Sequence, residues 1–180
     1  MTLNLNYKQM KISPEQKQEL EDIYQSFLHD EKIMRMKEIP MHRGSNCYEH
    51  CFKVAKLAIK RALRHKKASL EVVLLASILH DYYLYDWRKD RELLKHHGKV
   101  HPKLAAENAY RDFGVSPIIQ NAIKSHMWPL NFKDFPKSKE ARILTWADKA
   151  ICIREALTSI RHKKKNRNRY LAYIDKLFDK

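Results

Sequence analysis

Apolar residues recur at three- and four-residue intervals along most of the chain, and this spacing predicts amphipathic helices. The first helix has a clear start: Ser13 can cap it, Pro14 suits its first turn, and Gln16 completes a capping box. We predict that it runs to about Met36, before the break at Pro40. Its inward face carries Leu20, Ile23, Tyr24, Phe27 and Leu28.

The same pattern, with breaks at proline and glycine, predicts the helices that follow. The third is apolar on nearly all sides and should be the central one. Residues 85–99 are polar and loop-like, with at most a short helix at 91–94, and the basic run 161–169 reads as an interhelical turn. The second predicted helix ends near Arg64, and the third covers residues 70–82. The fourth opens at His101 and ends at Gly114. The remaining predicted helices cover residues 117–126, 139–160 and 170–178.

Taken together, these segments predict an all-α fold. No stretch alternates apolar and polar residues as a strand would. We therefore expect a compact, single-domain helical bundle of about six to seven helices over residues 1–180, with residues 161–180 packed on it.

Charge and composition limit the partners and the location that we expect for the protein. The formal net charge of +15 favours anionic partners, which include phosphorylated metabolites, nucleic acid and anionic lipid. No apolar run approaches the roughly 20 residues of a membrane span, and the N-terminus lacks a signal peptide, so a cytoplasmic location is expected. We expect Cys47, Cys51 and Cys152 to be reduced packing residues rather than metal ligands or redox groups.

Candidate chemistry begins at His80-Asp81. The apolar run 72–79 drives this pair into the interior, where two ionisable side chains are costly unless they are paired or bound to a metal. Imidazole and carboxylate are both good ligands for first-row metal ions. Four further residues lie at predicted helix ends or on an inward face: His50, His101, His126 and Asp148.

Any one of these histidines is most simply a hydrogen-bonded core or surface residue. The ordered set favours a metal site, because five separate elements would otherwise each need an unrelated reason to point a ligand inward. His29, His65 and His162 lie among charged residues and are expected to be solvated.

In this order the residues resemble the HD-domain metal-dependent phosphohydrolases, whose pattern is H…HD…D. A two-metal subset adds two histidines between HD and the final Asp, and this chain reads His50, His80-Asp81, His101, His126, Asp148. The resemblance covers roughly residues 42–155. The segments HDYYLYDW, HHGKVHPKLAAENA and SHMWPL are also similar to a poorly characterised bacterial branch.

The resemblance implies a dinuclear centre. One ion would take His50, His80, Asp81 and Asp148; the other would take Asp81 through its second oxygen, His101 and His126. The ions would be divalent or transition metals, among them Fe, Mn, Co, Ni and Zn. A hydroxide that bridges them would attack a small phosphorylated or nucleotide-type substrate.

Asp81, as the shared ligand, would stand at the reaction centre. His97 and Arg43, on segments just before His101 and His50, are candidates to contact phosphate or to protonate a leaving group. The alternative is that both are solvated loop residues.

Two other functions fit the same residues. Relatives with this ligand order include di-iron oxygenases. The run RHKKKNRNR, residues 161–169, would suit a nucleotide- or nucleic-acid-binding module whose metal site is not catalytic. We favour hydrolysis because positive charge suits a phosphate substrate; nucleic acid is the less favoured partner. The ligand pattern does not specify which bond is hydrolysed, which metal is native or which oligomer forms.

Overall fold

The computed structural model describes residue 3 and residues 12–41, 45–65, 67–89 and 91–178, without the side chains of 91–93 and 162–178. Within these ranges the protein is all-α, and no strand is formed. The predicted fold class is therefore confirmed. The elements are α1 (Pro14–His29), α2 (Glu31–Met34), the 3-10 helix η2 (Arg35–Glu38), α3 (Cys47–Ala62), α4 (Leu70–Leu79), α5 (Arg91–Phe113), α6 (Pro117–Ser125) and α7 (Lys139–Phe178).

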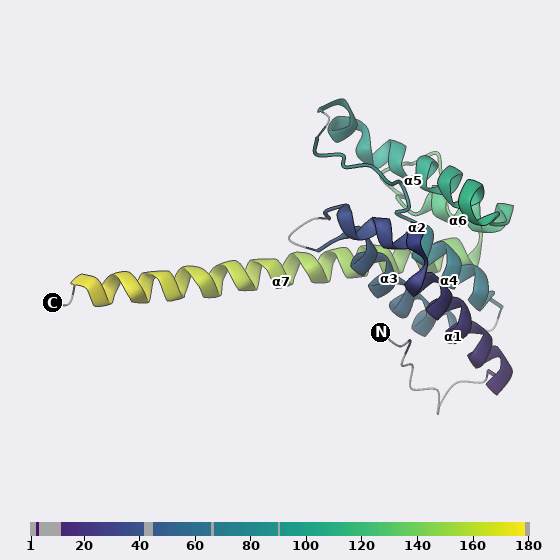
Figure 1. Ribbon diagram of the computed structural model, residues 1–180, viewed down its shortest axis with the longest axis horizontal. Helices are drawn as coiled ribbons and strands as arrows, with labels where there is room; N and C mark the ends of the chain where they lie inside the picture. Colours follow the sequence, from purple (N-terminus) through teal and green to yellow (C-terminus); the bar gives the residue numbers. More distant parts are fainter. Residues whose placement is uncertain (1–2, 4–11, 42–44, 66, 90, 179–180) are drawn as a thin grey trace.

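Helix α4 is the centre of the bundle, as its sequence predicts. It packs against α3, α6 and α7, and α5 packs on α6 (Figure 1). Burial of an apolar side chain contributes about 1.5–3 kcal/mol, so this helix is a main source of stability. Its fully buried side chains include Val73, Leu74, Ala76, Ile78 and Leu79.

Local sequence signals place most of the helix starts. Ser13 and Gln16 form the predicted capping box, and the hydroxyls of Ser69 and Ser138 accept backbone N–H bonds at the starts of α4 and α7. Asn46 caps α3 by accepting from the Glu49 amide. Gly114 follows α5 with φ 62°, a conformation that glycine adopts without strain.

The first helix ends earlier than predicted. Asp30 has extended backbone angles and accepts a bond from the Ile33 amide. Its side chain therefore caps a new helix and separates α1 from α2. The helix predicted over residues 70–82 is α4, and it is also shorter than predicted. It stops at Leu79 and leaves His80 as its C-cap.

The prediction that a helix opens at His101 is wrong. Helix α5 begins at Arg91 and contains Pro102 in its interior. A proline has no N–H for the carbonyl four residues earlier, here Gly98. That carbonyl instead accepts a bond of 3.1 Å from the side-chain amide of Asn131, so the helix continues through the proline.

The predicted turn at 161–169 is also wrong, because α7 is one helix of 40 residues through the basic run. The segment holds no glycine or proline, and Lys and Arg are good helix formers. In Figure 1 its C-terminal part projects beyond the other helices. The expectation that residues 161–180 pack on the domain concerns side chains outside the described ones, and it stays a prediction.

Candidate metal centre

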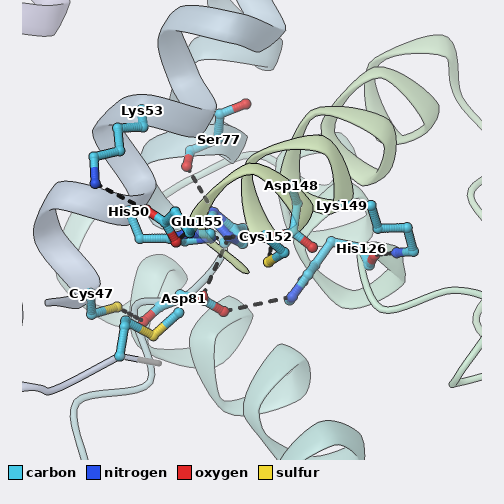
Figure 2. A network of polar contacts seen from close by, with 12 residues as sticks. Cys47, His50, Lys53, Ser77, Asp81, His126, Asp148, Lys149, Cys152 and Glu155 are labelled. Atoms are coloured by element: carbon cyan, nitrogen blue, oxygen red, sulfur yellow. Dashed lines mark hydrogen bonds and ion pairs between the residues drawn. The ribbon is translucent and has the colours of Figure 1, made fainter. Parts of the chain in front are cut away.

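The structure brings the six predicted ligands together from five elements. His50 lies in the first turn of α3, His80 and Asp81 follow α4, His101 lies in mid-α5, His126 caps the end of α6, and Asp148 lies on α7. All six are buried, with exposed fractions between 0% and 6%. Figure 2 shows four of them, His50, Asp81, His126 and Asp148, converging on one point between the helices.

A first group of donor atoms surrounds one oxygen of Asp148. His50 Nε2 lies 3.2 Å from Asp148 Oδ1, and His80 Nε2 lies 3.8 Å from the same atom. The second carboxylate reaches this group as well, since Asp81 Oδ2 lies 3.4 Å from His80 Nε2.

A second group surrounds the other oxygen of Asp81. His101 Nε2 lies 3.2 Å from Asp81 Oδ1, and His126 Nε2 lies 3.6 Å from it. The two oxygens of one carboxylate thus face two different sets of histidines. This is the geometry that a bridging ligand needs.

Hydrogen bonds fix which nitrogen each of three histidines presents. The Nδ1–H groups of His80, His101 and His126 donate to the carbonyls of Ser77, His97 and Ile123 at 2.7–2.9 Å. Such bonds leave the Nε2 lone pair directed into the site, as metal-bound histidines require. Ser77 and Ile123 lie in the last turns of α4 and α6, where backbone carbonyls are not all paired along the helix, whereas His97 lies inside α5.

Two buried atoms in the site have no hydrogen-bond partner among the described residues: His80 Nε2 and Asp81 Oδ1. In addition, His101 Nε2 and His126 Nε2 lie 3.0 Å apart, and with Nδ1 protonated both are acceptors. Such acceptors repel one another unless a cation or a proton lies between them. The donor set therefore fits metal ions.

The electrostatics couple the carboxylates of the site to its imidazoles. Burial alone would lower the pKa values of His50 and His80, but nearby carboxylates, Asp148 and Asp81 among them, raise both well above their usual value. Burial alone would raise the pKa of Asp81, but His80 and His101 outweigh it and hold the pKa well below its usual value. Burial, together with the neighbouring imidazoles of His80 and His101, lowers the pKa of His126 to about 3. The carboxylate is therefore ionised and this imidazole is neutral, and both are the forms that bind cations.

Two neighbours of the site on α7, Glu155 and Cys152, were not predicted as part of it. His50 Nδ1 lies 3.2 Å from Glu155 Oε2, and Lys53 Nζ lies 3.0 Å from Glu155 Oε1 (Figure 2). Cys152 Sγ donates to Asp148 Oδ1 at 3.4 Å. A sequence signal exists, because Cys152 and Glu155 follow Asp148 by four and seven residues and so share its helix face.

A pocket of about 370 Å³ opens beside the ligands. Its described lining contains no lysine or arginine, and its titratable side chains are those of five of the ligands, His97 and Cys152. The non-ligand lining is Met41, Trp87, Leu94, His97, Gly98, Met127 and Cys152.

Of the residues expected around the site, His97 lines this pocket. Its ring stacks between Trp87 and His101, with centroid distances of 5.1 and 4.5 Å. Its Nδ1 lies 2.8 Å from the Tyr85 hydroxyl. Arg43 lies outside the described residues.

Comparison with known proteins agrees with this geometry. The family model described as the HD domain matches residues 47–151, more than half of the chain. No curated protein and no solved structure matches the chain. Of the helices in the described part, none has the length and apolar character needed to cross a membrane.

Proposed function

The chain belongs to the HD domain family, and we propose that it is a phosphohydrolase that uses two divalent or transition-metal ions to act on a small phosphorylated or nucleotide-type substrate. Members of this family generally are metal-dependent phosphohydrolases. The observation that carries the proposal is the division of the Asp81 oxygens between His80 on one side and His101 with His126 on the other.

The distances support the two ligand sets that we propose. His50, His80, Asp81 and Asp148 would hold one ion, and Asp81, His101 and His126 the other. Nitrogen and carboxylate donors suit Fe, Mn, Co, Ni or Zn. When bound, such ions supply an activated water and neutralise charge on phosphoryl oxygens.

The pocket supports a small substrate. Because its described lining offers no lysine or arginine, we expect the phosphoryl group to sit at the ligand end of the pocket. The remainder of the substrate would lie against Trp87, Leu94 and Met127, whose apolar surfaces exclude water.

His97 is our candidate to donate a proton to the leaving group. Burial and the Asp81 charge raise the pKa of Tyr85 to about 12, so its hydroxyl stays protonated and can donate to His97 Nδ1. In that tautomer the imidazole carries its proton on Nε2. We also retain Arg43 as a candidate phosphate contact, since in the sequence it lies four residues before the start of α3 and two after the pocket residue Met41.

The test is to purify the protein without added metal, reconstitute it with each candidate ion, and screen phosphorylated metabolites, including nucleoside monophosphates, for phosphate release. We expect release that requires metal and that is abolished by chelation. Consumption of O₂ with an organic substrate, without phosphate release, would instead identify an oxygenase. Nucleic-acid binding that survives chelation, without phosphatase activity, would identify a binding module.

A further inference from the structure

We propose that Cys152 supplies a thiolate ligand to the ion held by His50, His80 and Asp148, which makes this half of the centre a nitrogen, oxygen and sulfur site. This inference rests on the proposed dinuclear function, and it departs from the sequence-based expectation that all three cysteines only pack. It concerns a residue outside the H…HD…H…H…D pattern.

The geometry begins with Asp148 and Cys152, one turn apart on α7. Cys152 Sγ lies 3.4 Å from Asp148 Oδ1, the oxygen that His50 Nε2 approaches to 3.2 Å. One ligand atom from each of these three residues lies within 4.8 Å of the other two. A cation held between Asp148 and His50 would therefore lie next to the sulfur.

A second observation points to the same place. His80 is fully buried, and its Nε2 has no hydrogen-bond partner among the described residues. This nitrogen lies 3.8 Å from the same Asp148 oxygen. Four potential ligands of a transition metal thus surround one point. They are the unsatisfied nitrogen of His80, the imidazole of His50, an oxygen of Asp148 and the sulfur of Cys152.

The proton balance is simple. Without a cation the thiol keeps its proton and donates it to Asp148 Oδ1. When the cation binds, the S–H bond breaks, a sulfur–metal bond forms, and the proton passes to solvent, with no electron transferred. Cys152 is exposed, so the proton can leave directly to water.

The other two thiols are the matched controls. Cys47 and Cys51 are buried, and the Cys47 thiol donates to the backbone carbonyl of Asp81 at 3.1 Å. They also form a possible ligand group with Asp81, so a sulfur signal from them must be distinguished from one due to Cys152. A thiolate ligand would favour Co²⁺, Fe²⁺ and Zn²⁺ over Mn²⁺.

The experiment is a Co²⁺ titration of the full-length metal-free protein, followed by absorption spectroscopy. We expect visible d–d bands in the wild type, in Cys152→Ser and in Cys47→Ser. A near-ultraviolet thiolate-to-Co²⁺ charge-transfer band should appear in the wild type and in Cys47→Ser, and be absent from Cys152→Ser. Affinity for Co²⁺ should fall at least about tenfold in Cys152→Ser, and affinity for Mn²⁺ much less.

Alkylation gives a second readout that is independent of any variant. Iodoacetamide should modify the exposed Cys152 of the metal-free wild type, and Co²⁺ should slow this reaction strongly. Mass spectrometry identifies the modified cysteine. Unchanged labelling in the presence of bound Co²⁺ would overturn the proposal, even if Cys152→Ser failed to fold.

The outcomes separate the two proposals. If the wild type binds no Co²⁺, the metal centre itself, and the proposed function with it, is wrong. If it shows d–d bands but no charge-transfer band, or if that band persists in Cys152→Ser, the thiolate ligand is wrong and the metal centre stands.

Discussion

At the scale of single residues, Asp81 is the side chain on which both halves of the proposed centre would depend. Its Oδ2 faces His80, and its Oδ1 faces His101 and His126. A neutral imidazole has one lone pair and cannot face two sites in this way. A carboxylate after His80 therefore has a role that a further histidine could not fill.

Asp81→Asn should lose most bound metal, and turnover should fall by on the order of 100-fold or more. The amide keeps the shape but removes the negative charge, and an uncompensated buried charge costs about 3–5 kcal/mol. His126→Ala should lose mainly one ion. Elemental analysis and turnover of both variants test this, with circular dichroism to confirm that the helices remain. An Asp81→Asn protein with two ions and near-normal turnover would refute the bridging role.

Glu155 should act by orienting His50. It lies 3.2 Å from the Nδ1 of that histidine, so it holds the ring with Nε2 directed at Asp148. We expect Glu155→Gln to weaken metal binding by about 10–100-fold, measured by metal titration.

Lys53→Gln is the control for Glu155. It removes the other partner of this carboxylate, and its side chain is 45% exposed, so the ion pair is worth about 0.2–1 kcal/mol. An equal loss of affinity in both variants would show that Glu155 acts through the ion pair rather than through His50.

At the scale of elements, α5 depends on a residue outside the helix. The missing N–H of Pro102 leaves the Gly98 carbonyl to the side-chain amide of Asn131. Asn131 is 9% exposed, and its bond to Gly98 is partly buried. The same stretch of α5 carries His97 and His101, so this bond supports one wall of the centre.

Asn131→Ala should lower the free energy of unfolding by about 1 kcal/mol, the usual net value of one hydrogen bond. Pro102→Ala restores a backbone donor for Gly98, so Asn131→Ala should cost less in that background. Urea unfolding of the wild type, both single variants and the double variant measures this coupling. Strictly additive effects would show that Asn131 does not compensate for the proline.

At the scale of the whole molecule, the basic residues behind the net charge of +15 are unevenly distributed. The described pocket lining holds no lysine or arginine, whereas the run 161–169 lies on the part of α7 that projects beyond the other helices (Figure 1). The net charge therefore does not by itself locate a phosphate site.

Replacing the Lys and Arg residues of 161–169 by Gln should leave turnover of a small substrate within a few-fold. Exposed charges are screened over a Debye length of about 8 Å at physiological salt. Turnover at that salt, with metal content and helicity checked, is the measurement. Complete loss of activity with fold and metals retained would place the run in the active site.

The sequence by itself determined the features that depend on near neighbours. Helix periodicity, the caps at Ser13 and Ser69, and the stop at Gly114 act within three or four residues, so they can be recognised without a fold. The order His50, His80-Asp81, His101, His126, Asp148 was also readable, because each residue lies at a predicted helix end or on an apolar face, although His101 in fact lies inside α5.

Only the tertiary structure decided the features that join distant residues. Asn131 reaches a carbonyl 33 residues away and lets α5 pass through Pro102, whereas a proline read alone predicts a helix start. Glu155 joins His50 across 105 residues, and Cys152 joins the centre with it, because α7 packs against α3. Local patterns show which face a residue occupies, but only packing shows what that face meets.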